Sequence, residues 1–436
     1  MKPIQVGLLG IGTVGSGTFQ VLQRNQEEIR RRAGRGITIT MVADLDVARA
    51  RQVVGNAVQV VSDARAVINN PEIDIVIELI GGYGIAKALV LEAIAVGKHV
   101  VTANKALLAV HGSEIFAAAR EKGVIVAFEA AVAGGIPIIK ALREGLTANR
   151  IEWLAGIING TTNFILSEMR AKGLDFGVVL KQAQALGYAE ADPSFDIEGV
   201  DAAHKATIMS AIAFGVPVQF DKAYIEGITG LQAADIRYAE QMGYRIKLLG
   251  IARRREHGIE LRVHPTLIPS TRLIANVEGA MNAVVVQGDA VGTTLYYGKG
   301  AGSEPTASAV IADLVDITRL ATADAQHRVP HLAFQPGMMS DTPILHIDEV
   351  VTAYYLRLVV ADKAGVLARI TGILADNDIS IDAVLQRESA EGEKQTDLII
   401  LTHATVDGRM KSALAQMQAL PTVLAPIVRI RKEELN

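Results

Sequence analysis

The sequence predicts an α/β protein in which a doubly wound, mostly parallel sheet is followed by an α+β domain and a small ferredoxin-like domain. Three observations predict this. An apolar strand at residues 4–9 leads through a glycine-rich turn into a helix, strands and helical spacers alternate to about residue 128, and residues 350–436 carry short elements in the order βαββαβ. A chain of 436 residues is long enough for two or three domains, each with its own core.

The first strand is followed at once by a nucleotide-binding pattern. Residues 10–15 read Gly-Ile-Gly-Thr-Val-Gly and open a helix with apolar periodicity. In this context the first glycine permits a tight turn, the second lets the backbone approach a pyrophosphate, and the third lets helix and strand pack closely. The pattern indicates a Rossmann-type dinucleotide site whose phosphates meet helix N-terminal amides. Its residues are Gly10, Gly12, Thr13, Val14 and Gly15.

Further strands are expected at residues 37–42, 73–80, 98–102 and 124–128. The strand at 37–42 is followed by Asp44. A carboxylate there usually hydrogen-bonds the ribose of NAD and repels the 2′-phosphate of NADP, so Asp44 favours NAD. Two alternatives stay open: Asp44 is a helix N-cap, or nearby arginines hold a phosphate.

Two later segments face the carboxyl edge of this sheet, where ligands bind. Thr102, Asn104 and Lys105 follow the strand at 98–102 and are expected near the nicotinamide, although Lys105 is equally typical of an exposed helix start. Glu129 follows the strand at 124–128 and leads into small residues up to Pro137. A carboxylate with inward carbonyls suits a hard cation, and a hinge between domains fits the same composition.

The middle of the chain changes pattern. A helix from residue 138, a strand at 151–158 and a helix from Phe164 are expected, with Asn-Gly-Thr-Thr-Asn at 159–163 between them. Strands at 244–253, 259–267 and 283–286 lack regular crossover helices, so this domain is α+β with a mainly antiparallel sheet. A glycine-rich segment at 298–306 then opens a helix at 307–321, either approaching the cofactor or closing a loop.

An acidic segment at residues 187–205 carries five carboxylates and one lysine. Proline and glycine predict a loop at 190–196 and a helix at 202–214, so Asp201 and Lys205 share one helical face. A solvated ion pair is the ordinary interpretation of such a pair. The apolar run after Lys205 instead predicts a largely buried helix, and a buried lysine beside carboxylates indicates a functional site.

Composition narrows the class of protein. The net charge is −4, from 43 basic and 47 acidic residues, and gives no general attraction to nucleic acid or anionic lipid. The absence of cysteine excludes disulfides and thiolate nucleophiles and fits a reducing cytoplasm. The N-terminus has no secretory pattern, and no stretch of about 18 residues is free of charge. We therefore expect a cytoplasmic protein that acts on small molecules.

The order and spacing of these motifs resemble homoserine dehydrogenase over residues 1–325. That family reduces aspartate 4-semialdehyde to homoserine with NAD(P)H, in the biosynthesis of threonine, methionine and isoleucine. The resemblance implies that Lys205 is the acid/base group, Asp201 its partner and Lys105 a residue beside nicotinamide and substrate. It also implies a substrate site of Glu190, which binds the ammonium, with Asp196, Thr161, Gly160 and Tyr188.

The chemistry of the reaction agrees with these implied roles. Hydride delivered to an aldehyde carbon leaves an alkoxide, which needs a proton donor and positive charge, and lysine supplies both. The resemblance further implies Gly302 at the cofactor, and sodium or potassium at Glu129 with the carbonyls of Val132, Gly134 and Ile136. Many relatives carry a basic residue where this chain has Ala43, so we expect NAD to be accepted at least as well as NADP.

The C-terminal segment is predicted to be a regulatory domain that senses a small molecule. Residues 323–349 are punctuated by proline and predict a linker. The segments at 362–367 and 377–381 resemble the ACT domain, a family that binds small amino acids at domain interfaces. Threonine is the first effector to test, and a dimerisation module without a ligand is the alternative. The expected effector residues are Asp362, Ala364, Gly365, Val366, Asn377 and Ile379.

The sequence thus predicts a dinucleotide-binding domain at 1–137, completed by the helix at 305–322, a catalytic and dimerisation domain at 138–304, and a regulatory domain at 350–436. We expect a homodimer or homotetramer. Two other functions stay open: a dehydrogenase of another amino-acid-like alcohol or aldehyde, and a non-catalytic sensor of NAD and amino acids. The intact set of Lys105, Glu190, Asp201 and Lys205 argues against the sensor.

Overall fold

The computed structural model describes residues 2–324, 327–386 and 394–436. It divides into two compact units, and the chain passes between them several times. The first unit comprises Met1–Ile158, His204–Asp221 and Met281–Thr342. The second comprises Asn159–Ala203, Lys222–Ala280 and Pro343–Asn436.

The first unit contains a six-stranded parallel sheet in the order β3-β2-β1-β4-β5-β6. The strand order reverses between β1 and β4, and in such sheets ligands bind at that point, beyond the carboxyl ends of the strands. The sequence did not predict β3, because it is short and only partly buried. The strands are β1 (Ile4–Leu9), β2 (Ile37–Ala43), β3 (Gln59–Val61), β4 (Ile75–Glu78), β5 (His99–Thr102) and β6 (Val126–Ala127).

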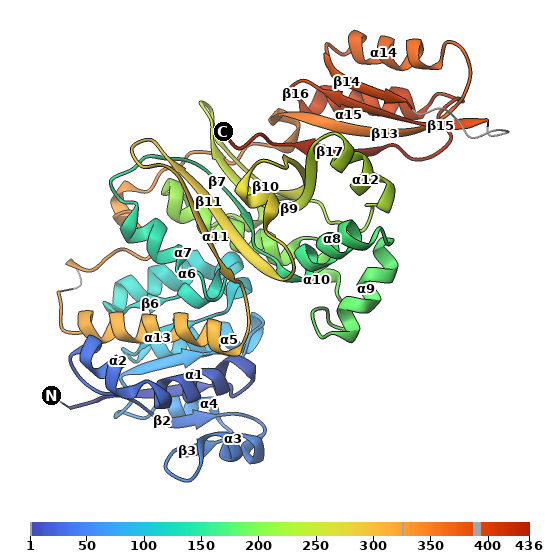
Figure 1. Ribbon diagram of the computed structural model, residues 1–436. Coiled ribbons are helices and arrows are strands. Elements are labelled where there is room, and N and C mark those ends of the chain that lie inside the picture. Colours follow the sequence, from blue (N-terminus) through green and yellow to red (C-terminus); the bar gives the residue numbers. More distant parts are fainter. Residues whose placement is uncertain (1, 325–326, 387–393) are drawn as a thin grey trace. The chain divides into compact units, whose positions relative to one another are not determined.

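Helices cover this sheet, and one of them comes from far along the chain. Helix α13 (Ser303–Leu320) packs beside α1, as Figure 1 shows. A Cβ atom at Gly17 would lie 2.3 Å from the Ser303 Oγ, so only glycine permits this approach. Helix α13 begins at Ser303 rather than Ala307, because Pro305 fits the first turn of a helix, where no donor is needed. The other helices are α1 (Thr13–Arg24), α2 (Gln26–Ala33), α3 (Val47–Val54), α4 (Ala64–Ile68), α5 (Gly84–Ala95) and α6 (Lys105–Lys122).

The first unit also holds the antiparallel strands β7 (Ile151–Ile157), β11 (Met281–Gly288) and β12 (Gly292–Lys299), in the order β12-β11-β7. The sequence missed β12, whose residues alternate between half-buried and exposed. A short helix, α7 (Ile138–Lys140), lies where a helix was expected.

The second unit contains a mixed sheet in the order β9-β10-β17-β13-β15-β14. Strand β17 pairs parallel with β10 on one side and antiparallel with β13 on the other. The last strand of the ferredoxin-like βαββαβ module therefore joins it to the hairpin β9–β10. The strands are β9 (Tyr244–Arg254), β10 (Ile259–Pro269), β13 (Val351–Ala361), β14 (Ile381–Gln386), β15 (Gln395–Thr402) and β17 (Val428–Lys432), with β8 (Tyr224–Ile225) paired to β10 and β16 (Thr405–Val406) paired to β13.

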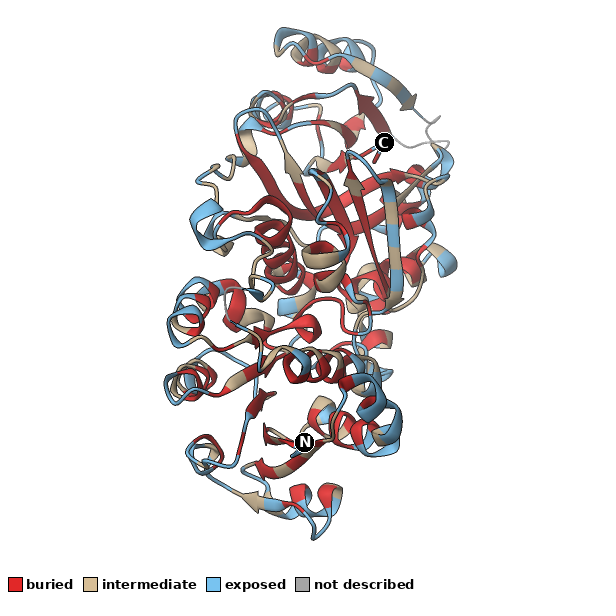
Figure 2. Cartoon of the chain, turned by 90° about the vertical axis from the view of Figure 1, so that its left-hand side faces the viewer, coloured by how far each residue is buried: buried red, intermediate tan, exposed pale blue. Residues whose placement is uncertain are grey.

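Helices α14 (Val366–Asp376) and α15 (Asp407–Gln418) complete the ferredoxin-like module. In Figure 2 the sheet strands are largely buried, while the outer faces of the helices are exposed. The predicted fold class, with a Rossmann-type sheet, an α+β part and a ferredoxin-like module, is confirmed. The predicted domain boundaries stay a prediction.

Two local predictions in the second unit were wrong. Helix α8 begins at Gly160 and not at Phe164, because the Asn159 side chain caps it by accepting the Thr162 N–H at 2.8 Å. The predicted loop at 190–196 ends in a short helix, α10. The helices here are α8 (Gly160–Lys172), α9 (Phe176–Ala185), α10 (Ser194–Ile197) and α12 (Ala233–Gln241); α11 (Val200–Phe214) begins in the second unit and ends in the first.

Candidate active site

The glycine loop after β1 has the geometry that a dinucleotide needs. Gly10 has φ +93°, and a Cβ atom there would lie 2.8 Å from the Leu79 carbonyl oxygen. A Cβ atom at Gly15 would lie 2.1 Å from the Gly10 carbonyl oxygen. At Gly12, by contrast, a Cβ atom would meet nothing within 4 Å. The turn is tight, and its open side lies at the start of α1, so the residues fit a bound pyrophosphate.

Asp44 lies just beyond the carboxyl end of β2 and binds this loop. Its Oδ2 accepts the Ile11 N–H at 2.7 Å and its Oδ1 accepts the Asp46 N–H at 2.9 Å. The cap of α3 is Asp46, which accepts the Arg49 N–H at 3.0 Å. The alternative of Asp44 as an N-cap was therefore wrong. The preference for NAD stays a prediction.

Glu78, at the carboxyl end of β4, is fully buried and was missed by the sequence analysis. Its Oε2 accepts the Thr102 hydroxyl at 2.8 Å, and its Oε1 accepts the N–H groups of Ile80 and Gly81 at 2.8 and 3.0 Å. A carboxylate ending an apolar strand was the available signal. Through these hydrogen bonds, Glu78 holds the loop after β4 against the end of β5.

Asn104 and Lys105 begin α6. The Asn104 side chain caps the helix by accepting the Leu107 N–H at 3.1 Å, and its Nδ2 donates to the Gly82 carbonyl at 2.6 Å. Lys105 is the first residue of α6 and is half-buried. Because Thr102 also accepts the Asn104 N–H, the local structure fixes the loop that presents Lys105. Their contacts with a cofactor stay predictions.

The Glu129 carboxylate caps α7. Its two oxygens accept the N–H groups of Ile139 and Lys140 at 2.9 and 2.8 Å. Burial raises the pKa of Glu129 to about 7, against the effect of those hydrogen bonds. The Glu129 N–H in turn donates to Asp313 at 2.9 Å, and burial also raises the pKa of Asp313. The two carboxylates thus accept backbone N–H groups at the junction of Glu129, α7 and α13.

The small residues after Glu129 have a packing role. A Cβ atom at Gly134 would lie 2.5 Å from the Gly300 carbonyl oxygen, and the Gly135 N–H donates to the Lys299 carbonyl at 3.0 Å. Gly302, with φ +123°, caps α13. The close packing of this loop against residues 299–300 explains why glycine is needed here, and that explanation does not require a bound cation. The cation set of Glu129, Val132, Gly134 and Ile136 therefore stays a prediction.

Lys205 is a buried lysine in α11. The residue is 9% exposed, and its Nζ donates to the Ile158 carbonyl at 2.8 Å. Asp201, one helical turn earlier, is 4% exposed. The predicted burial of the helix is confirmed, and the alternative of a solvated ion pair was wrong.

In the second unit, Asn159 joins two carboxylates of the acidic segment. Its Nδ2 donates to Asp196 Oδ1 at 2.7 Å and to Asp201 Oδ2 at 2.9 Å. The Thr161 hydroxyl contacts Asp196 Oδ2 at 3.2 Å and the Tyr188 carbonyl at 2.7 Å. The sequence analysis missed Asn159, although its position before a helix start was a signal for a cap.

The rest of the predicted substrate set lies around this cluster. The Tyr188 ring stacks on Phe164 with 4.5 Å between centroids, and a Cβ atom at Gly160 would lie 2.9 Å from the Ala280 carbonyl oxygen. Glu190 is exposed, and its carboxylate has no hydrogen-bond partner in the part of the chain that the structure describes. It is thus available to an external ammonium.

Asp192 has a local role. Its Oδ1 accepts the Ser194 N–H at 3.1 Å and the Ser194 hydroxyl at 2.6 Å. These hydrogen bonds lower the pKa of Asp192. The side chain stabilises the turn into α10.

Lys247, on β9, is a second buried lysine that the sequence analysis missed. Its Nζ donates to the Val277 carbonyl at 2.6 Å and to the Asn163 Oδ1 at 3.1 Å. Burial lowers the pKa of Lys247 to about 8, although nearby Glu278 raises it. Lys247 therefore fixes the first turn of α8, which carries Thr161.

The predicted effector residues form two groups. Asp362, Ala364, Gly365 and Val366 lie at the start of α14, where Gly365 has φ +89°. Asn377 and Ile379 follow the other end of that 11-residue helix, about 16 Å away. One copy of the module therefore does not bring the two groups together.

Comparisons with known protein families cover most of the chain. Residues 10–129 match the NAD binding domain of homoserine dehydrogenase, residues 137–315 match homoserine dehydrogenase, and residues 354–421 match the ACT domain. A homoserine dehydrogenase of Pseudomonas aeruginosa is 63% identical, with 100% of both chains covered. The chain belongs to the homoserine dehydrogenase family.

Solved structures of the family agree. The crystal structure of a homoserine dehydrogenase from Thiobacillus denitrificans has 66% identity and a TM-score of 0.96, covering 100% of this chain and 99% of that one. Homoserine dehydrogenase of S. aureus has 31% identity and a TM-score of 0.75, with 99% of both chains covered. The predicted family, the oxidoreductase activity on homoserine with a nicotinamide cofactor, and the ACT domain are confirmed.

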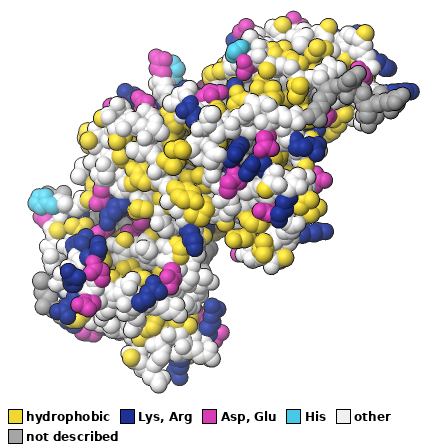
Figure 3. All heavy atoms as spheres, in the orientation of Figure 1, with side chains coloured by type: hydrophobic (Ala, Val, Ile, Leu, Met, Phe, Trp, Pro, Cys, Tyr) yellow, Lys and Arg dark blue, Asp and Glu magenta, His cyan; other side chains and the backbone are white. Residues whose placement is uncertain are grey.

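The distribution of charge on the surface agrees with an enzyme that acts on small molecules. On the face seen in Figure 3, acidic and basic side chains are interspersed, in line with the nearly balanced charge. Among the described helices, none is both long and apolar enough to cross a membrane.

Proposed function

We propose that Lys205 is the acid/base residue in the reversible reduction of L-aspartate 4-semialdehyde to L-homoserine. The observation that carries this is a buried lysine whose Nζ is held by the Ile158 carbonyl, on the helix that also bears Asp201. The bound nicotinamide supplies or accepts the hydride. Lys205 stabilises the oxygen that becomes an alkoxide and gives it a proton; in the reverse direction it removes that proton.

The other residues bind and orient. Asp201 positions Lys205, and Asn159 fixes the Asp201 carboxylate. Glu190 binds the substrate ammonium with its free carboxylate, and Asp196 supports that pocket together with Thr161, Gly160 and Tyr188. Lys105, presented at the start of α6, acts beside nicotinamide and substrate.

Asp44 gives the enzyme its cofactor preference in this proposal. Its position beyond β2 and beside the glycine loop suits a ribose hydroxyl, and its charge opposes a 2′-phosphate. With Ala43 in place of a basic residue, NAD is used at least as well as NADP. Thr102, Asn104 and Gly302 complete the cofactor site through the loops they fix.

Three further roles belong to the same proposal. A sodium or potassium ion binds at Glu129 and the main-chain carbonyls of Val132, Gly134 and Ile136. Threonine acts on the ACT domain at the loop before α14, in a cytoplasmic homodimer or homotetramer. A second copy of the domain would bring the Asn377 group to that loop.

One set of measurements tests the proposal. Homoserine oxidation is followed with NAD and with NADP, with threonine present and absent, in the wild type and in Lys205→Ala. We expect Lys205→Ala to lose about 100- to 10,000-fold in kcat while the Kd for NAD changes little. Lys181→Ala, at an exposed lysine, is the matched control. Retained turnover in Lys205→Ala would refute the role of the lysine.

A further inference from the structure

The first unit contains a cavity of about 340 Å³ that is lined by residues outside the candidate active site. It lies between the second half of α6, the chain that leads into β6 and the segment at residues 328–339. Because all six strands of this sheet are parallel, the chain that leads into β6 lies at the amino edge, while ligands of such sheets bind at the carboxyl edge. The cavity is therefore separate from the dinucleotide site, and its volume suits a small molecule.

The wall of the cavity is mostly apolar. Phe334 packs against Gly215, where a Cβ atom would lie 2.8 Å from the Phe334 Cγ, and Phe334 is still 38% exposed. The Ser340 N–H donates to the Gly215 carbonyl at 2.6 Å, which fixes this segment to the end of α11. An exposed aromatic ring in a concave wall offers apolar surface that a ligand can cover. The apolar lining residues are Phe116, Val124, Pro217, Leu332, Phe334 and Met339.

The charged groups of the cavity are all basic. Arg120 and Arg328 line it, and no aspartate or glutamate does so in the part of the chain that the structure describes. Arg328 donates to the main-chain carbonyls of Gly123, Ala321 and Ala323 at 2.7 to 3.3 Å. These carbonyls hold the guanidinium in place but carry no net charge. Arg120 is exposed in the last turn of α6, and among the described residues no carboxylate pairs with either arginine.

His331, which also lines the cavity, is a further hydrogen-bond donor. Its Nε2 accepts the Val126 N–H at 3.1 Å, and its ring stacks on Phe116 with 5.3 Å between centroids. Burial, and then the positive charges of nearby arginines, lower the pKa of His331 to about 4, so the ring is neutral at pH 7. A neutral imidazole that accepts at Nε2 carries its proton on Nδ1. The cavity thus combines donors and positive charge with an apolar wall.

We propose that this cavity binds a small apolar carboxylate, with its oxygens at the two arginines and His331 and its hydrocarbon part against Phe334 and Leu332. Charge-assisted hydrogen bonds from guanidinium groups suit a carboxylate. An amino acid fits less well, because the lining offers no acid to its ammonium group. A phosphate also fits less well, because the apolar wall would remove water from its other oxygens without replacing the hydrogen bonds. The ligand is therefore a monocarboxylate without an amino group.

A ligand here contacts the far ends of the two helices that carry the candidate catalytic lysines. Lys105 begins α6, and the cavity is lined by that helix from Ser113 onward, about 12 Å farther along the axis. Lys205 lies on α11, which is followed by Pro217 in the cavity wall. The ligand thus binds without touching the reacting groups, and it does not compete with cofactor or substrate.

Calorimetric titration of the full-length protein tests the site, with octanoate, phenylacetate and the neutral octanamide as probes. We expect the carboxylates to bind and octanamide to bind about tenfold more weakly, because it lacks the charge that the arginines require. Titrations repeated with NAD alone and with homoserine alone should give the same affinity for the carboxylates. Displacement by either compound would place the carboxylate in the catalytic site and overturn the proposal.

Two variants with matched controls locate the binding. Ala117→Phe fills the cavity from an exposed position of α6 and should weaken octanoate binding by about tenfold or more. Arg120→Gln removes one charge and should weaken it by about threefold or more. Ala148→Phe and Lys122→Gln, at exposed positions outside the cavity, should bind as the wild type does.

Three other results would overturn the proposal: no binding of either carboxylate, equal affinity for octanoate and octanamide, or unchanged binding in Ala117→Phe. If Ala117→Phe does not fold, Ser113→Trp fills the same cavity from an exposed position one turn earlier. The readout is binding and not turnover. Its outcome is therefore independent of the outcome for Lys205→Ala.

Discussion

At the scale of single residues, Asn159 shows why an amide is placed between carboxylates. Asp196 and Asp201 would repel each other as neighbouring anions, and one Nδ2 donates to both. The Oδ1 of the same side chain caps α8. One residue therefore fixes the two acids and the helix that carries Thr161.

This arrangement predicts the effect of Asn159→Asp. The substitution replaces a donor with a third acceptor, so the two carboxylates lose their shared hydrogen bonds and gain a repulsive neighbour. We expect kcat/KM for homoserine to fall by about 100-fold, which corresponds to about 2.7 kcal/mol. Asn276→Asp, at an exposed asparagine, is the control and should retain activity. Equal kinetics for the two variants would contradict the role of Asn159.

At the scale of elements, the corner of η1 (Glu129–Ala131), α7 and α13 depends on two buried carboxylates. Glu129 caps α7 and is itself bound by Asp313 of α13. The pKa of both groups is raised by burial, and the charge of Glu129 raises the pKa of Asp313 further. The stability of this corner therefore depends on pH.

The sign of this coupling gives a prediction. Glu129 has a folded-state pKa of about 7, above its usual value, so its contribution to stability is fully present below about pH 4.5 and is lost as the pH rises through 7. From this group alone, the free energy of unfolding should fall by up to about 3 kcal/mol between pH 5 and pH 8. Urea unfolding at several pH values, in buffers without sodium or potassium, measures it.

The matched variants are Glu129→Gln and Glu121→Gln. The first removes the titrating group and should flatten the dependence on pH, even though it weakens the cap of α7. The second changes an exposed glutamate and should keep the wild-type slope. A slope unchanged in Glu129→Gln would show that other groups cause it.

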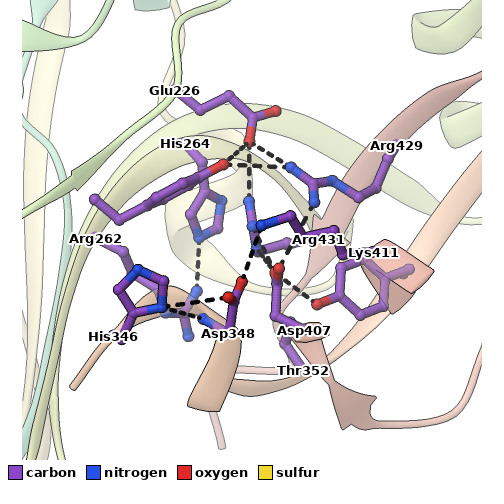
Figure 4. A network of polar contacts seen from close by, with 12 residues as sticks. Glu226, Arg262, His264, His346, Asp348, Thr352, Asp407, Lys411, Arg429 and Arg431 are labelled. Carbon is purple, nitrogen blue, oxygen red and sulfur yellow. Dashed lines mark hydrogen bonds and ion pairs between the residues drawn. The ribbon is translucent and has the colours of Figure 1, made fainter. Parts of the chain in front are cut away.

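At the scale of the whole molecule, β17 connects the ACT domain to the hairpin β9–β10 through buried charges. The Arg431 guanidinium, 1% exposed as a side chain, donates to Asp407 at 2.6 Å and to Glu226 at 3.0 Å. On β10, Arg262 binds Glu433 at 2.6 Å and Glu260 at 2.8 Å. The pair of Arg262 with Glu433 links β10 to the residue after β17, while Arg431 links β17 to α15 and to the loop after β8 (Figure 4).

Removing one member of this network should lower the free energy of unfolding. Arg431→Leu leaves the buried Asp407 without its main partner, so we expect the second unit to lose about 3–5 kcal/mol in free energy of unfolding. Arg409→Leu breaks an ion pair with Asp378 in which both side chains are exposed, and should cost about 1 kcal/mol or less. Urea unfolding of the two variants makes the comparison. Similar losses in both would show that the network at β17 is not what joins the strands.

Most of the fold could be predicted because it depends on local patterns. Five of the six strands of the parallel sheet, the helix α11 and the βαββαβ order follow from apolar periodicity and turn residues. The missed strands β3, β8, β12 and β16 are short or lie at edges, where burial is incomplete and alternation is weak. The pattern predicts the last strand at residues 423–430, but β17 begins at Val428, because Pro426 lacks the N–H that a ladder requires.

The candidate site was predictable in part for the same reason. The glycine motif, the carboxylate after the second strand and the acidic segment are each local features of the sequence, so they pointed to Gly10, Asp44, Asp201 and Lys205 without a structure. Glu78, Asn159 and Lys247 were missed, because each acts through partners distant in sequence. The Asn159 contact with Asp196, for example, spans 37 residues.

By itself, the sequence determined the fold class, the nucleotide-binding loop and the family resemblance, because these depend on periodicity and fixed spacing along the chain. Only the tertiary structure decided that Lys205 is buried against the Ile158 carbonyl, that Asn159 lies between two aspartates and that β17 joins β10 to β13. Burial and pairing depend on which distant segments meet, and that follows from packing the whole chain around shared cores.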